Sequence, residues 1–282
     1  MKGFINVLKP SGVSSAYAVG VVKRKVNCPC GHMGTLDPMA SGVLPVGIDK
    51  TSRLFPFLLE KKKTYVARFL FGKTTDTLDI TGTITGQTDI VPTEEQLQNV
   101  IKKFVGKIAQ VPPKYSAKCI NGKRGYELSR KGVDFTLEAK NVVIDSITLN
   151  AKTGENEYEF TICCGGGTYI RSLARDIAFS CNSLGVMTKL ERIKSGVFTL
   201  ENGVDLETLK NSDSIEQFLL PADIAVDFPK LVLTSAQAQK ILDGVYLDYG
   251  FTDGVYRVYN EDDFWGIAKV EDGVVRIKPY VR

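Results

Sequence analysis

Residues 158–181 have the sequence YEFTICCGGGTYIRSLARDIAFSC, in which a strand, a glycine turn and a helix follow one another directly. Tyr158, Phe160 and Ile162 occupy every second position, which is the period of a β-strand. After the glycine turn the apolar residues recur at helical spacing, at Ile170, Leu173, Ile177 and Cys181. This unit predicts a fold that combines strands with helices.

Further elements are predicted towards the N-terminus. Apolar and alternating residues predict two strands, at residues 3–8 and 65–71. Capping residues predict two helices, one from Ser14 or Ser15 to about Lys25 and one after the capping box TEEQ at residues 93–96. Stretches rich in polar and turn-forming residues predict loops, at residues 27–47 and 74–86.

The pattern changes after Pro221. A short helix is predicted near residues 235–242, and three strand-like runs follow, at residues 255–259, 264–270 and 274–280. We therefore expect two domains, an α+β domain over residues 1–227 and a small β-rich domain over residues 228–282.

Composition limits the class of protein. The chain has 282 residues, 43% hydrophobic and 24% charged, so it can bury a core and is unlike a disordered chain. Its longest apolar runs are shorter than the roughly 18 residues that a membrane span needs. The opening sequence MKGFINVLKP lacks the layout of a signal peptide. We expect a cytoplasmic protein that does not act at a membrane.

Several kinds of catalytic site are disfavoured. The six cysteines lack the regular spacing of a disulfide framework, and we expect reduced thiols. Cys28, Cys30 and His32 are too closely spaced for zinc, and no second pair completes four ligands. His32 is the single histidine, and no nucleophile is evident beside it. GKT at residues 72–74 lacks the earlier glycine of a phosphate-binding loop, because residue 67 is alanine.

Positive charge is concentrated in the first part of the chain. Residues 1–131 contain 21 basic and 9 acidic side chains, whereas residues 201–282 contain 8 and 15. Segments 61–63 and 114–131 add clustered lysines and arginines, the latter with Tyr115 and Tyr126 between them. Such a distribution favours a polyanion such as nucleic acid, and an ordinary solvated surface is the alternative.

The sequence GHMGTLDPMASG, residues 31–42, places Asp37 among glycines and directly before a proline. Glycines let a backbone approach a bulky ligand, and a rigid turn can present one carboxylate for attack on a ligand atom. An ordinary Asp-Pro turn has the same pattern, so the residues alone leave both interpretations open.

The glycine turn at residues 165–167 is a second candidate. A glycine turn that opens a helix presents free N–H groups, and Arg171 adds a fixed fork of donors. Capping by Thr168 with a surface arginine is the alternative. Tyr65 and Tyr169 lie next to these candidate segments and could stack on a nucleobase or belong to the core.

Five segments of the sequence together resemble the motifs of the bacterial TruB family, the tRNA pseudouridine synthases that act on uridine 55. They are NVLKPSGVSS (6–15), residues 31–44, KTY (63–65), residues 164–173 and LER (190–192). PPKYSA (112–117) is also similar. Departures from the family pattern are Gly165, Gly166, Cys119 and Ile193, which concern RNA contacts more than the nucleophile.

The resemblance implies the pseudouridine-synthase fold, a mixed, mostly antiparallel sheet flanked by helices and loops. It also implies that the C-terminal domain is a PUA-like β-barrel that binds RNA. Asp37 matches the nucleophile, which attacks either C1′ of the ribose or C6 of the uracil. Arg171 matches the ion-pair partner of Asp37.

The remaining motif residues match substrate-binding positions. Tyr65 is expected to stack on the flipped-out base, and Leu190 is expected to pack against it. His32 is expected near the space that the base leaves. Tyr169, beside Arg171, and Lys9, in the opening motif, complete the set.

The expected function is isomerisation of uridine 55 in the TΨC stem-loop of tRNA by a monomer. This chemistry needs no redox change and no metal, so we expect no cofactor. Three alternatives remain: a non-catalytic tRNA-binding or tRNA-folding protein, an N-glycosidase that uses Asp76 or Asp79 with Asp37, and a related synthase directed to ribosomal RNA by a guide complex.

Overall fold

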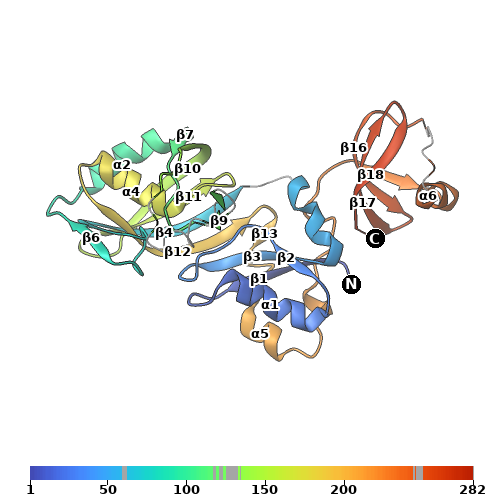
Figure 1. The fold of residues 1–282 in the computed structure, drawn as a ribbon, viewed down its shortest axis with the longest axis horizontal. Helices are drawn as coiled ribbons and strands as arrows, with labels where there is room; N and C mark the ends of the chain where they lie inside the picture. The colour runs from blue at the N-terminus through green and yellow to red at the C-terminus, as the bar shows by residue number, and fades with distance from the viewer. Residues whose placement is uncertain are drawn as a thin grey trace. The chain divides into compact units, whose positions relative to one another are not determined.

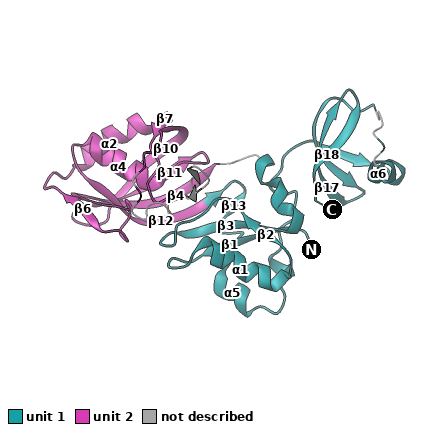
Figure 2. Cartoon of the chain, in the orientation of Figure 1, with its two compact units in different colours: residues 1–61, 194–282 teal, residues 62–193 magenta. Residues whose placement is uncertain are grey.

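The computed structural model describes residues 1–58, 62–116, 133, 135–243, 245 and 250–281, and the backbone of 119–120 and 123–124. The chain forms two compact units (Figure 2). Unit 1 comprises Met1–Lys61 and Lys194–Arg282, and unit 2 comprises Lys62–Ile193. The domain boundary expected at residues 227/228 stays a prediction. The Cys119 and Tyr126 side chains lie outside the described residues.

Unit 1 is built around β1 (Gly3–Lys9), which is buried over almost its whole length. It pairs in antiparallel register with β3 (Ser41–Ile48) and in parallel with the short β14 (Val204–Asp205). β2 (Cys30–His32) also pairs with β3. Helix α1 (Ser15–Val26) follows β1, and Ser14 caps it by accepting from the Tyr17 N–H, which confirms the predicted helix start.

The loop predicted over residues 27–47 is wrong in part, because β2 and most of β3 lie within it. The sequence of β3, SGVLPVGI, contains two glycines and a proline, which ordinarily mark turns. Gly47 is required by packing. A Cβ there would lie 2.9 Å from the Ser52 backbone, in the 3₁₀ segment η1 (Asp49–Phe57) that covers this strand.

The C-terminal part of unit 1 forms a separate four-stranded sheet in the order β15-β16-β17-β18. The predicted short helix and three strands are confirmed, and β15 adds a strand parallel to β16. These elements are β15 (Lys230–Leu233), α6 (Ser235–Leu242), β16 (Gly254–Asn260), β17 (Asp263–Glu271) and β18 (Val274–Tyr280). Closure into a barrel stays a prediction.

This C-terminal sheet shares a core with the first strands of unit 1. Phe4 and Val43 belong to the same buried cluster as Phe264 and Ile267. Lys2 donates to the Phe264 carbonyl at 2.7 Å. The connecting segment contributes β13 (Phe198–Thr199), α5 (Leu206–Asn211) and η3 (Glu216–Phe218). The beginning and the end of the chain therefore stabilise each other.

Unit 2 is a sheet in the order β12-β4-β11-β10-β7. The three pairs from β4 to β7 are antiparallel. The strands are β4 (Lys63–Phe71), β7 (Gly106–Gln110), β10 (Lys140–Lys152), β11 (Glu157–Cys164) and β12 (Gly185–Ser195, with its last two residues in unit 1). Together with unit 1 this gives a mixed, mostly antiparallel α+β fold, as predicted.

Two helices pack against each other and against the sheet of unit 2 (Figure 1). They are α2 (Glu94–Ile101), which begins at the predicted capping box, and α4 (Ile170–Ser180). The loop predicted over residues 74–86 begins and ends in a small antiparallel ribbon, β5 (Lys73–Thr75) with β6 (Ile84–Gln87). The remaining elements are η2 (Lys102–Phe104), β8 (Cys119–Ile120) and β9 (Lys123–Arg124).

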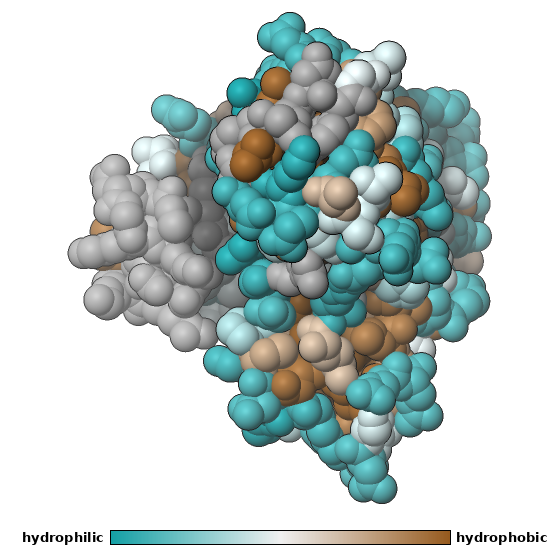
Figure 3. Space-filling model, turned by 90° about the vertical axis from the view of Figure 1, so that its right-hand side faces the viewer, coloured by the Kyte–Doolittle hydropathy of each residue, from teal (hydrophilic) through white to brown (hydrophobic). Residues whose placement is uncertain are grey.

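The surface shown in Figure 3 is mostly hydrophilic, with hydrophobic side chains in smaller groups. This is the usual division for a chain that buries most of its large apolar residues in its cores. Among the described residues, no helix combines the length and the hydropathy that crossing a membrane would require.

Candidate active site

Asp37 lies in the loop between β2 and β3 of unit 1 and is half-buried. Its backbone is fixed on both sides. Leu36 exchanges two hydrogen bonds of 2.9 Å with the buried Ser15 hydroxyl, and the Asp37 carbonyl accepts from the Ala40 N–H at 3.0 Å. The loop therefore presents the carboxylate from a defined backbone position.

Lys9 links the opening motif to the same loop through hydrogen bonds to backbone carbonyls. Its side chain is 1% exposed, and its ammonium donates to the carbonyls of Pro10 at 2.8 Å, Val13 at 2.7 Å and Pro38 at 3.3 Å. The Gly12 N–H also donates to the Pro38 carbonyl, at 2.8 Å. The opening motif is thus a clamp on the residue that follows Asp37. A direct contact between Lys9 and substrate stays a prediction.

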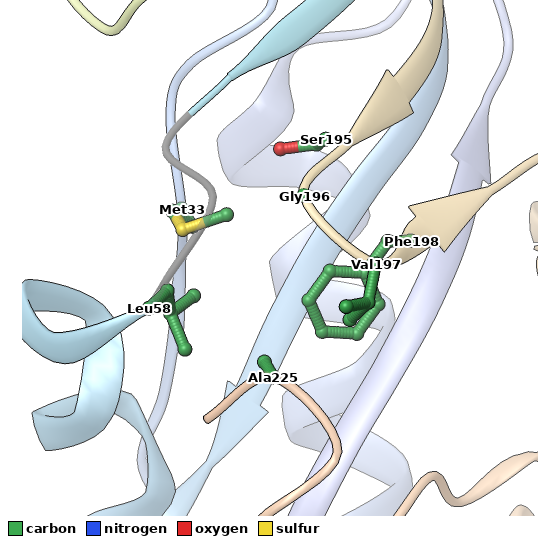
Figure 4. A pocket seen from close by; sticks show the side chains of 7 residues that line it. All are labelled: Met33, Leu58, Ser195, Gly196, Val197, Phe198 and Ala225. Carbon is green, nitrogen blue, oxygen red and sulfur yellow. The ribbon is translucent and has the colours of Figure 1, made fainter. Parts of the chain in front are cut away.

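His32 ends strand β2, opposite Val46 of β3, and is half-buried. The next residue, Met33, lines a small cavity in unit 1 (Figure 4). Its other lining residues are Leu58, Ser195, Gly196, Val197, Phe198 and Ala225. The cavity volume is about 10 Å³, close to the least that holds one water molecule. A nucleotide cannot bind there.

Arg171 is the second residue of α4 in unit 2 and is 6% exposed. Its guanidinium donates to the Thr77 carbonyl at 2.8 Å and to the Tyr115 carbonyl at 3.0 Å. It also forms an ion pair with Asp79, with 3.6 Å between Nη1 and Oδ2. The alternative of a surface arginine is therefore wrong, because three neighbours fix this guanidinium inside unit 2.

Asp79 is the ion-pair partner of Arg171, a role that the sequence patterns did not predict for it. It is 5% exposed, and its Oδ1 accepts from the Thr77 hydroxyl at 2.9 Å and from the Thr81 N–H at 3.0 Å. Gly82 packs closely against this loop, because a Cβ there would overlap Thr77 Oγ1. The TxDxT spacing from Thr77 to Thr81 was the available signal for a buried, hydrogen-bonded carboxylate.

The other predicted residues of unit 2 lie on its sheet and at the start of α4. Tyr65 is on β4, paired with Ile162 of β11, and Leu190 is on β12, the neighbouring strand of β4. Both side chains are 7% exposed. Tyr169 is half-buried and is the N-cap residue of α4.

The seven predicted residues thus fall into two groups. Unit 1 contains Asp37, His32 and Lys9 in one loop system, and unit 2 contains the remaining four, Tyr65, Tyr169, Arg171 and Leu190. The ion pair expected between Asp37 and Arg171 would join the two groups, and it stays a prediction.

The cysteines do not resemble activated thiols. Burial and the neighbouring Cys28 raise the pKa of Cys30 to about 11, and burial raises the pKa of Cys164 to about 11. Both thiols are therefore protonated at neutral pH, unlike a thiolate nucleophile. The described cysteines are unpaired with one another in disulfides. Within the described part of the chain, His, Cys, Asp and Glu form no group of three that could hold a metal ion.

Comparisons with known proteins agree with this architecture. The family model described as TruB family pseudouridylate synthase, N-terminal domain, matches residues 23–170. The model described as pseudouridine synthase II TruB, C-terminal, matches residues 229–281. The chain is therefore an enzyme of the pseudouridylate synthase class.

Curated relatives extend over nearly the whole sequence. The chain is 37% identical to tRNA pseudouridine synthase B of Ehrlichia chaffeensis, over 98% of this chain and 94% of the relative. It is 36% identical to the protein of the same name from Alkaliphilus oremlandii, over 96% and 95%. The chain belongs to the TruB family.

Solved structures share the fold. A chain in the structure of an H/ACA RNP bound to a substrate RNA containing 2′-deoxyuridine superposes with a TM-score of 0.67 and 25% identity, over 95% of this chain and 78% of that one. A chain in a crystal structure of a Cbf5-Nop10-Gar1 complex superposes with a TM-score of 0.71 and 24% identity, over 99% and 84%. The latter similarity concerns the fold alone.

Proposed function

We propose that this enzyme converts uridine 55 in the TΨC stem-loop of tRNA into pseudouridine, with Asp37 as the nucleophile. The observation that carries the proposal is the fixed Asp37 loop, with the opening motif clamped onto it, in a chain of the TruB family. The names of the curated relatives support tRNA as the substrate, and the excess of basic residues in 1–131 fits a polyanion.

The reaction is an isomerisation that one carboxylate can support. The N1–C1′ bond breaks, the uracil turns, and a C5–C1′ bond forms, while the hydrogen leaves C5 as a proton and N1 gains one. Asp37 attacks C1′ of the ribose or C6 of the uracil and is regenerated at the end. Neither redox chemistry nor a cofactor is required for this balance.

The other residues act on the flipped-out nucleotide in this proposal. Tyr65 stacks on the base and Leu190 packs against it, which offsets the cost of unstacking, a few kcal/mol. Tyr169 contributes to the same binding surface, Lys9 acts on the nucleotide through the Asp37 loop that it holds in place, and His32 lies near the space that the base leaves. Arg171 pairs with Asp37 and keeps it ionised, since a nearby opposite charge favours the charged form.

We also propose that the enzyme acts as a monomer, in the cytoplasm and on free tRNA. Residues 228–282 form a PUA-like RNA-binding domain, and residues 1–227 form the catalytic domain. Residues 228–282 contain 7 basic and 8 acidic side chains, so we expect this RNA contact to depend on shape and hydrogen bonds more than on net charge.

The test is tritium release from a tRNA transcript labelled at uracil C5, with Asp37→Asn as the matched variant. Substitution at C5 must release the label. Release by the wild type alone, and none from a transcript with cytidine at position 55, is the expected result. Free uracil in the product would indicate an N-glycosidase instead, and tight binding without release would indicate a tRNA-binding or tRNA-folding protein.

A further inference from the structure

Helix α4 begins in an unusual way. Its N-cap residue, Tyr169, makes no side-chain capping bond, and the preceding Thr168 hydroxyl donates to the Gly165 carbonyl instead. Capping by Thr168, the alternative considered from the sequence, is therefore wrong. The Tyr169 carbonyl accepts the first hydrogen bond of the helix from the Leu173 N–H at 3.1 Å, and the backbone of Tyr169 is also bound by another segment of unit 2.

That segment supplies the side chain of Gln110, the last residue of β7, which is 1% exposed. The Gln110 Oε1 accepts from the Tyr169 N–H at 2.8 Å, and its Nε2 donates to the Tyr169 carbonyl at 3.1 Å. A primary amide has the same donor and acceptor as a peptide group, so Gln110 binds Tyr169 as a neighbouring strand would.

The two bonds from Gln110 to the N–H and the carbonyl of Tyr169 restrain both of its backbone dihedrals. Tyr169 has φ −102° and ψ 110°, an extended conformation at the junction of turn and helix. The direction of its Cα–Cβ bond follows from those angles. Gln110 therefore helps to set the direction in which the Tyr169 side chain leaves the backbone. This restraint is separate from any contact of the ring itself.

The residues after Gln110 secure the first turns of α4. The Val111 carbonyl accepts from the Ser172 hydroxyl at 2.8 Å and from Arg175 Nη2 at 3.0 Å. The Tyr115 carbonyl accepts from Arg171. Residues 110–115 and the start of α4 are consequently one hydrogen-bonded assembly, with Gln110 at the residue where the helix begins.

We propose that Gln110 is a positioning residue for pseudouridine formation, acting through Tyr169 and, two residues further on, Arg171. This inference rests on the proposed function. Gln110 sets the approach of these side chains to the target nucleotide and makes no contact with RNA. Its loss is expected to slow the chemical step while RNA affinity, which depends on a large basic surface, stays nearly unchanged.

The test uses Gln110→Met, which keeps the length of the side chain and removes both bonds, and Gln110→Glu. A buried glutamate keeps the acceptor for the Tyr169 N–H when ionised, and both bonds when protonated. Ser183→Ala is the matched control. Ser183 is buried just beyond the other end of α4, where its hydroxyl donates to the Ile90 carbonyl, remote from Tyr169 in the helix.

Three quantities are measured for each variant: the single-turnover rate at saturating enzyme, the tRNA Kd and the melting temperature. We expect Gln110→Met to lower the rate on the order of 10- to 100-fold, the scale of a misplaced reacting group. Its Kd should stay within about threefold, since the phosphate contacts that dominate affinity are intact. Gln110→Glu should be faster than Gln110→Met, and Ser183→Ala should keep the wild-type rate.

Two results would overturn the inference while leaving the proposed function intact. The first is an active wild type with Gln110→Met equally fast at a temperature where both are folded. The second is a rate loss in Ser183→Ala as large as that in Gln110→Met at equal loss of melting temperature, which would show a general effect of stability. A wild type that forms no pseudouridine would overturn the proposed function itself, and this inference with it.

Discussion

The Asp37 loop of unit 1 and the Arg171 site of unit 2 position a charged side chain in opposite ways. In unit 1 the buried charge is Lys9, which fixes the loop through backbone carbonyls while Asp37 itself is half-buried. In unit 2 the candidate functional group is itself buried, between Asp79 and two carbonyls. We infer that function and stability are separable at Asp37 and linked at Arg171.

Asp37→Asn gives the largest expected effect on activity and a small one on stability. Removal of the proposed nucleophile should lower the single-turnover rate by about 10⁴-fold or more. Since the backbone hydrogen bonds from Ser15, Ala40 and Lys9 that hold the loop do not involve the carboxylate and are kept, the melting temperature should fall by only a few degrees, about 2–4 °C. Rate assays and thermal unfolding of the same preparation test both. A parallel loss of folding would remove the contrast between the two units.

Arg171→Lys should lower activity and stability together. Lysine retains the charge but not the fork of donors that reaches Thr77, Tyr115 and Asp79. We expect a rate about 100-fold lower and a free energy of unfolding lower by roughly 1–3 kcal/mol, since buried carbonyls lose their donors. Rapid-quench assays and urea unfolding measure the two effects. An unchanged unfolding free energy would contradict the assigned hydrogen bonds.

Asp79→Asn tests whether the carboxylate matters beyond its shape. The amide keeps the size of the side chain and removes the negative charge beside Arg171. We expect a rate about tenfold lower, since an orienting partner is weakened, and an unfolding free energy lower by roughly 1–2 kcal/mol. The double variant with Arg171→Lys should lose less than the sum of the two single losses. Additive losses would mean that the two residues act independently.

Lys9→Met gives the smallest expected loss of activity and sharpens the comparison from the side of unit 1. Methionine fills the space of the buried side chain, and three carbonyls lose one donor. The free energy of unfolding should fall by roughly 1–3 kcal/mol. The rate should fall less than tenfold, because the Gly12 N–H still binds the Pro38 carbonyl. A much larger loss of rate with normal stability would favour a direct contact between Lys9 and substrate.

The sequence predicted elements whose signals are local. The capping box at Thr93 and the strand-turn-helix unit of residues 158–181 became α2, β11 and α4, because their apolar spacing and caps lie within a few residues. Strand β3 was missed because it contains two glycines and a proline, of which Gly47 is required by its close packing against the Ser52 backbone. Local preferences alone assign such a glycine- and proline-containing segment to turns, because they take no account of tertiary packing.

The candidate site was predicted residue by residue, but not the contacts that position it. Asp79 and Arg171 are far apart in the sequence, and neither periodicity nor charge indicates that they pair. Gln110 ends an ordinary short strand. Its role depends on Tyr169, from which it is separated in the sequence by two long strands, β10 and β11. Such partners become visible only when the chain is folded, since they are set by tertiary packing.

Unit 1 is assembled from the two ends of the chain, and this has a consequence for folding during synthesis. All of unit 2 leaves the ribosome before residue 194, whereas Phe4 and Val43 have their core partners Phe264 and Ile267 near the C-terminus. Domains fold as their residues become available. Unit 2 can therefore complete its core first, while strand β1 emerges before unit 2 and is fully covered only after residues 264–267 have been made. The order of translation and the order of folding differ in this protein.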